Sequence, residues 1–375
     1  YHGLEDCEKY LNACVSASET FMNESGYTLY KSGSTPYRDL FASINLQADE
    51  VIFGRDYEAS LSVLHNVQNY ENSTTMGRPG MNKKIVNSYL MADGSRFTDK
   101  AGYETMTFDQ ECQNRDPRLA QTIRTPGYTR IGSTKKEAPN LAYTMTGYHL
   151  IKYSMTANYD EYNKSCNDIP LFRTAEVYLN FAEAKAELGT LKQADINKSI
   201  KLLRDRVGMT NLDMELANSK PDPYLMSAAT GYPNVKGANQ GVILEIRRER
   251  TIELAMEGFR YYDIMRWKEG KLFENDLLGI YVPGPGTYDL DKDGTDDVCF
   301  YVGTKPAGNV PLYLEIGEQI RLSNGESGYI ICHSLITKKW NEDRDYLYPV
   351  PISERTLSNG VITQNPGWND GLNFN

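Results

Sequence analysis

The chain has 375 residues, with 40 Lys and Arg against 50 Asp and Glu, which gives a formal net charge of −10. Hydrophobic residues make up 40% and charged residues 24%, a composition too apolar for a disordered chain. The mean hydropathy is −0.55, and no apolar run reaches the roughly 18 residues of a membrane-spanning helix. Because nucleic acids bind basic surfaces, an acidic chain excludes them as expected partners.

Helical periodicity marks three parts of the chain. Residues 4–22 carry apolar side chains at near-helical spacing and predict an amphipathic helix. Residues 173–208 predict two antiparallel helices, the second over 194–207, with Gly189 and Gly208 after their ends. This hairpin resembles one tetratricopeptide unit. Residues 241–267 predict a third helix.

The remaining segments lack a helical period. Residues 24–165 and 270–345 are rich in turn-forming residues and contain only short apolar pieces. We therefore expect irregular structure with loops and short strands in these two segments.

A long polar loop at residues 62–83 is a candidate ligand-binding site. It offers one aromatic ring with amide and guanidinium groups around it: Asn66, Tyr70, Asn72 and Arg78. An aromatic ring stacks on the apolar face of a sugar, while amides and guanidinium groups hydrogen-bond to the hydroxyls. An ordinary surface loop is the alternative interpretation.

An acidic run follows between two predicted strands. Its aspartates match positions one, three, five and nine of a calcium-binding loop: Asp289, Asp291, Asp293 and Asp297. Position twelve is Phe300 rather than glutamate, and no pair of helices flanks the run, so it is not an EF-hand. A loop ordered by Ca²⁺ and a solvated acidic turn remain alternatives.

Motifs of catalysis are weak. Glu253 and Glu257 lie one helical turn apart, so the paired carboxylates of a carbohydrate-active hydrolase are conceivable. Ion pairs with nearby arginines are the simpler interpretation. The four histidines are scattered, and the six cysteines lack metal-ligand spacing. The sequence therefore gives no positive indication of an enzyme.

Three groups of residues resemble the SusD/RagB family of outer-membrane nutrient-binding lipoproteins. They are residues 169–184 with 203–209, residues 246–267, and residues 346–354 with 363–368. The sequence at 114–118 and the turn at Asp93-Gly94 are similar too. These elements follow the family's order and span nearly the whole chain.

The resemblance implies a mainly α, SusD-like fold over residues 1–375, with tetratricopeptide-like helix pairs and an inserted irregular subdomain of loops and short strands. It implies a binding protein without catalytic activity, lipid-anchored on the extracellular face of the outer membrane in Bacteroidetes. Such a protein captures an oligosaccharide or polysaccharide and passes it to a SusC-like TonB-dependent transporter. A peptide or protein cargo is the alternative. Some members bind calcium, and residues 289–297 are similar to an acidic segment that recurs in the family.

The front of the chain departs from the family pattern. The family's signal peptide, lipid-anchor cysteine and first helical repeats have no counterpart before Tyr1. We therefore expect an N-terminally incomplete domain, whose only membrane contact is through an anchor outside these residues.

Overall fold

The structure is a computed structural model that describes residues 6–374, and 34% of it is helix and 12% strand, which confirms the mainly α fold. The helices are α1 (Cys7–Glu24), α2 (Pro36–Ala42), α3 (Val67–Glu71), α4 (Lys83–Ser88), α5 (Phe108–Glu111), α6 (Pro117–Ala120), α7 (Thr174–Glu187), α8 (Gln193–Asn197), α9 (Ile200–Arg206), α10 (Met214–Ser219), α11 (Pro223–Met226), α12 (Gln240–Glu253), α13 (Phe259–Arg266) and α14 (Ile352–Leu357). The strands are β1 (Val51–Arg55), β2 (Ile169–Arg173), β3 (Leu277–Val282), β4 (Gly286–Tyr288), β5 (Val298–Tyr301), β6 (Leu312–Glu315) and β7 (Gly328–Cys332).

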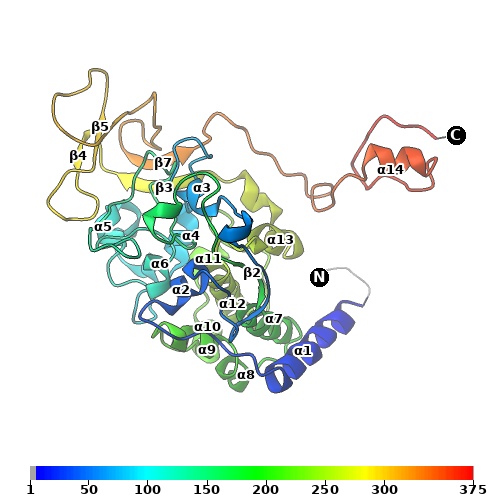
Figure 1. The fold of residues 1–375 in the computed structure, drawn as a ribbon. Coiled ribbons are helices and arrows are strands. Elements are labelled where there is room, and N and C mark those ends of the chain that lie inside the picture. Colours follow the sequence, from blue (N-terminus) through cyan, green and yellow to red (C-terminus); the bar gives the residue numbers. More distant parts are fainter. Residues whose placement is uncertain (1–5, 375) are drawn as a thin grey trace.

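The helical part is built around α7, which packs against both α1 and α12 (Figure 1). Ala182 and Ala186 of α7 are buried in one apolar cluster with Val242 and Ile246 of α12. Small side chains let two helices approach closely, so these alanines allow the crossing of α7 with α12. The antiparallel strands β1 and β2 flank the helices.

The predicted helix over residues 194–207 is two helices, α8 and α9. The side chain of Ser199 donates to the carbonyl of Asp195 at 2.6 Å, and its backbone amide bonds instead to Ile196. A serine hydroxyl that takes the acceptor of its own amide interrupts the helical hydrogen-bond pattern. The apolar spacing continues across the break, which is why the pattern predicted one helix.

The single helix predicted over residues 241–267 is wrong as well, because α12 ends at Glu253 and α13 begins at Phe259. Arg173 donates to the carbonyl of Glu253 at 2.8 Å, and Lys152 donates to the carbonyl of Ala255 at 2.6 Å. These side chains take carbonyls that the next turn would need. Met256 then adopts a left-handed conformation with φ of 65°.

At the front of the described residues, α1 begins at Cys7 and continues to Glu24, two residues beyond the predicted end at residue 22. Leu4, from the predicted helix, lies outside the described residues.

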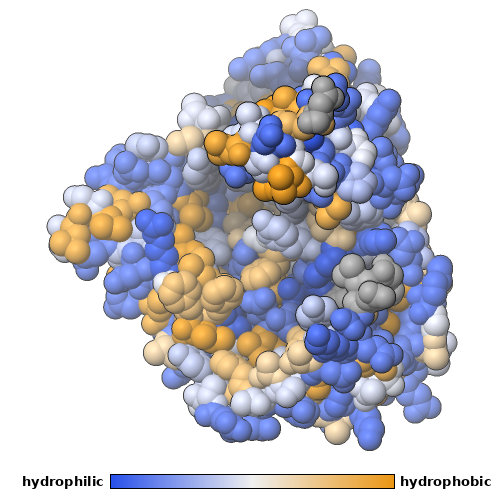
Figure 2. Space-filling model, turned by 90° about the vertical axis from the view of Figure 1, so that its right-hand side faces the viewer, coloured by the Kyte–Doolittle hydropathy of each residue, from blue (hydrophilic) through white to orange (hydrophobic). Residues whose placement is uncertain are grey.

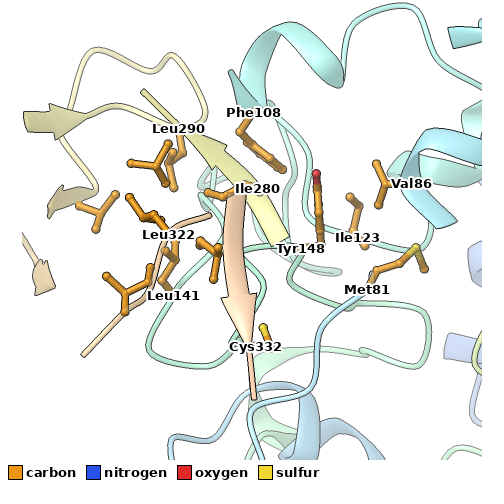
Figure 3. Packing of buried hydrophobic residues seen from close by; sticks show 14 of the residues in the cluster. Met81, Val86, Phe108, Ile123, Leu141, Tyr148, Ile280, Leu290, Leu322 and Cys332 are labelled. Carbon is orange, nitrogen blue, oxygen red and sulfur yellow. The ribbon is translucent and has the colours of Figure 1, made fainter. Parts of the chain in front are cut away.

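The irregular subdomain draws one core from both of its segments. Figure 3 shows Val86, Ile123 and Tyr148 from the first segment packed with Ile280 and Leu322 from the second. Strands β3 and β7 pair antiparallel, while β4, β5 and β6 form a separate sheet in which β5 and β6 run parallel. The core thus holds loops from distant parts of the chain against one another.

A C-terminal arm, residues 341–374, projects from the body and carries α14 (Figure 1). Its base is attached through Tyr346, whose hydroxyl accepts a hydrogen bond from the amide of Gly270 at 2.9 Å. Further along, Arg355 pairs with Asp370, and the Trp368 indole donates to Leu347 at 2.8 Å. Figure 2 looks onto the side from which the arm projects and shows apolar residues around a hollow there.

Candidate functional site

The candidate loop is ordered around the short helix α3, which is fixed by buried amides. The amide nitrogen of Gln68 donates to the carbonyl of Thr156 at 2.8 Å and to Asp160 at 2.7 Å. Its oxygen accepts from the backbone of Met155 at 2.7 Å, and Asn69 donates to the carbonyl of Asp160 at 2.7 Å. These bonds hold α3 firmly against residues 155–160.

Tyr70 projects from this anchored turn and is 50% exposed. Beside it, Asn66 donates to the side chain of Asn163 at 2.9 Å and accepts from its backbone at 2.5 Å. Tyr162, the neighbour of Asn163, is 62% exposed. The structure therefore adds a second aromatic ring, from the adjacent segment, that the sequence did not single out. The signal available was Tyr162 beside Asn163 in a stretch rich in polar residues.

Asn72 does not belong to this surface, because its side chain is buried and fully engaged. Its oxygen accepts from Arg124 at 2.8 Å and from Arg130 at 3.0 Å, and its nitrogen donates to the carbonyl of Gln68 at 3.1 Å. A sugar hydroxyl would have to displace charged donors. We therefore remove Asn72 from the predicted ligand-binding set and assign it to the support of α3.

Glu71, between Tyr70 and Asn72, points inward and is 2% exposed. It accepts a hydrogen bond from the Ser154 hydroxyl at 2.6 Å. Burial raises the pKa of Glu71 to about 7, although the bond from Ser154 opposes the shift. The support of α3 therefore contains a carboxyl that titrates near neutrality.

Arg78 lies apart from the other predicted residues, in the wall of a cavity of about 430 Å³. None of Asn66, Tyr70 or Asn72 lines this cavity. The guanidinium of Arg78 donates through Nη2 to the carbonyl of Leu141 at 2.5 Å. The structure thus separates the polar loop into a tyrosine surface at α3 and an arginine cavity.

The acidic run forms the turn between β4 and β5, and there the structure brings three carboxylates together. Oxygens of Asp289, Asp291 and Asp297 all lie within 4.8 Å of one another. Burial, with the charges of the neighbouring aspartates, raises the pKa of Asp297 to about 6. Burial likewise raises the pKa of Asp291. Crowded carboxylate oxygens of this kind fit a hard divalent cation such as Ca²⁺.

Asp293 is the exception among the four predicted ligands, since it is outside the group of three. Its carboxylate accepts from the backbone amide of Thr295 at 2.8 Å, as a short acidic side chain does in a turn. Its own amide donates to Asp291 at 3.1 Å. Asp293 shapes the turn, and the set of candidate ligands is reduced to three.

The carboxylates of the conceivable hydrolase site are bound by basic side chains. Glu253 accepts from Arg173 at 2.8 Å, from Arg118 at 3.1 Å, and from Arg206. Burial by itself would raise the pKa of Glu253, but these three arginines hold it well below its usual range. Such a carboxylate cannot serve as a general acid.

Glu257 is occupied in the same way. One oxygen accepts from Lys152 at 2.6 Å and from Arg173 at 2.8 Å, and the other accepts from Arg173 at 2.7 Å. Two further buried carboxylates, Glu50 and Glu249, pair with arginines nearby. We call these groups the α12 network: Glu50, Arg118, Arg173, Arg204, Arg206, Glu249, Glu253 and Glu257.

Comparison with known proteins identifies the family. The sequence profile of the SusD family matches residues 40–368. The chain belongs to the SusD family. No curated protein sequence gives a significant match.

Several solved structures from Bacteroidetes have the same fold. A SusD-like protein from Bacteroides fragilis has a TM-score of 0.61 and 21% identity, over 96% of this chain and 62% of that one. A SusD-like carbohydrate binding protein from the same species has a TM-score of 0.58 and 20% identity, over 93% and 61%. A SusD superfamily protein from Parabacteroides distasonis has a TM-score of 0.51 and 17% identity, over 98% and 59%.

The chain therefore spans about 60% of the length of these relatives. Among the described residues, no helix is both long and apolar enough to cross a membrane.

Proposed function

We propose that the protein binds an oligosaccharide or polysaccharide at the cell surface, with Tyr70 and Tyr162 as stacking residues. Membership of the SusD family and the half-exposed side chain of Tyr70, on a turn anchored through Gln68 and Asn69, support this proposal. A backbone turn that is fixed before binding lowers the ordering cost when a sugar packs on its side chain. Asn66 and Asn163, in the same two segments, hydrogen-bond to each other, and their remaining amide N–H groups could donate to hydroxyls.

The cellular role follows from the family. The protein would hold its glycan on the extracellular face of the outer membrane, lipid-anchored, and pass it to a SusC-like TonB-dependent transporter. It would release the glycan unchanged, because the carboxylates that could have formed a hydrolase pair are bound by Arg173, Arg118 and Lys152.

We also propose that Ca²⁺ binds in the turn between β4 and β5. Asp289, Asp291 and Asp297 would hold the ion, and it would relieve the repulsion between their charges. Its role there is to order the turn.

The test is a titration of soluble polysaccharides, their oligosaccharides and matched peptides by isothermal calorimetry. The unaltered protein should bind a glycan, and Tyr70→Ala should weaken that binding roughly tenfold, because an aromatic contact contributes about 1–1.5 kcal/mol. Tyr10→Ala is the matched control, since Tyr10 is an exposed tyrosine on α1. Binding of peptides with no glycan binding, or steady release of cleaved sugar, would overturn the proposal.

A further inference from the structure

The cavity that Arg78 lines has the size and the walls of a small-molecule site. Its volume is about 430 Å³, and small-molecule sites usually enclose ~300–1,000 Å³. The walls include Leu141, Met145, Leu335 and Ile336. Their apolar side chains could cover the C–H face of a sugar ring but offer nothing to a charge.

The polar groups of the cavity are mainly basic, although the whole chain is acidic. Arg78, Arg321 and His333 line it, and Glu318 is the acidic residue among the lining side chains. In a chain with a net charge of −10, this is a local reversal of sign. A basic lining attracts an anion, because complementary charge guides binding.

Arg78 has unused hydrogen-bonding capacity. In the described part of the chain it makes a single side-chain hydrogen bond, to Leu141, and no ion pair with a carboxylate. Its Nε atom is buried without a partner. A guanidinium with donors left over binds a carboxylate through charge-assisted hydrogen bonds.

Backbone conformation marks the same cavity. Arg78 has a φ of 50° and His333 a φ of 55°, both in the left-handed region that side-chain-bearing residues rarely adopt. Two such residues in the wall of one cavity indicate a constraint on where their side chains point.

We propose that this cavity binds the carboxylate-bearing sugar residue of an acidic glycan, with the Arg78 guanidinium on the carboxylate. The inference rests on the proposed glycan-binding function and adds the chemical class of the glycan, a uronic acid. The apolar wall covers the sugar ring, and the basic side chains compensate the negative charge of the carboxylate. Tyr70 and Tyr162 lie outside the cavity lining, so the cavity is a separate subsite.

The experiment compares trigalacturonate with its methyl ester by calorimetry, at low and at physiological salt. Esterification removes the charge but keeps the sugar. The acid should bind at least tenfold more tightly than the ester, and the difference should shrink as salt screens the charges. Glucuronate oligosaccharides form a second arm, which distinguishes between the two common uronic acids.

Arg78→Gln should weaken binding of the acid roughly tenfold and leave binding of the ester unchanged, while Arg78→Lys should retain part of the difference. Lys31→Gln is the control for the loss of one positive charge, because Lys31 is exposed and outside the cavity lining. If Arg78→Gln does not fold, the comparison of acid with ester in the unaltered protein still decides whether the protein recognises the carboxylate.

Each failure has a distinct result. Equal affinity for the acid and the ester would overturn the uronic-acid subsite while the glycan-binding function stands. No binding of any glycan would overturn both. Arg78-dependent binding of a tripeptide through its free carboxylate, as tight as that of trigalacturonate, would show that the cavity recognises peptides and would overturn the sugar assignment.

Discussion

The α12 network and the loop surfaces use the same residue types in opposite ways. In the network, Glu253 is met by three arginines, and the charges are paired within a buried core. In the turn between β4 and β5, Asp289, Asp291 and Asp297 face one another, and Arg78 has no carboxylate partner in the described residues. Paired charges stabilise the fold, whereas charges left without a partner are the ones available to a ligand.

Among the tests of this comparison, Glu253→Gln has the largest expected effect. The change keeps the shape of the side chain but leaves Arg173 and Arg206 buried with less compensation. We expect a loss of about 3–5 kcal/mol in the free energy of unfolding, measured by urea denaturation. The control Glu19→Gln removes a carboxylate from an exposed pair with Lys198 and should cost less than ~1 kcal/mol. Equal losses in the two variants would show that the network is not a source of stability.

The second test adds Ca²⁺, as a positive partner for the three aspartates, to the turn between β4 and β5. Millimolar calcium should raise the melting temperature by about 2–4 °C, since saturation near 100 times the dissociation constant gives about 2.7 kcal/mol. Asp291→Asn should remove this shift, while Asp296→Asn, an exposed neighbour outside the group of three, should keep it.

Acidity should weaken the same effect. The raised pKa of Asp297, about 6, means that protons compete with calcium below that pH, so the shift should shrink between pH 7 and 5. An equal shift with magnesium, or one that persists in Asp291→Asn, would contradict the assignment of this turn.

The smallest expected effect concerns Glu71 in the support of α3. Its folded pKa of about 7 lies above the unfolded value of about 4.3, so its contribution to stability is complete below pH 4.3 and is lost as the pH rises through 7. Glu71→Gln keeps the neutral form at all pH values. The free energy of unfolding of Glu71→Gln, relative to that of the unaltered protein at the same pH, should therefore rise by on the order of 2 kcal/mol between pH 5 and pH 8.

Urea denaturation across this pH range measures the difference. Glu24→Gln, a change at an exposed carboxylate, should show no such gain. If the Glu71→Gln variant follows the unaltered protein at every pH, the carboxyl does not titrate near neutrality in the folded state.

Local sequence patterns predicted the structural features that depend on residues close together in the chain. The helices around α7 follow from apolar spacing, and the grouping of Asp289, Asp291 and Asp297 follows from their closeness in one turn. The break after Glu253 depends on Arg173 and Lys152, which reach it from 80 or more residues away. No period within residues 241–267 records such contacts.

Contacts with distant residues also explain why only part of the predicted polar loop forms a candidate binding surface. Asn72 is buried because Arg124 and Arg130 come to it from 52 and 58 residues further along. Tyr70 and Asn72 are both polar loop residues in the sequence, and only the folded chain separates the exposed ring from the buried amide. The cavity around Arg78 likewise needs Arg321 and His333, which no local motif connects with it.

The pairing of β1 with β2 makes residues 56–168 a closed excursion from the helical part. Arg55 lies opposite Ile169, so the chain leaves and returns at one place. Lengthening a closed loop costs little, about 0.6 kcal/mol for each doubling. Insertions and deletions near α3, away from Arg118 and Lys152, can therefore reshape the α3 surface while the helices keep their packing.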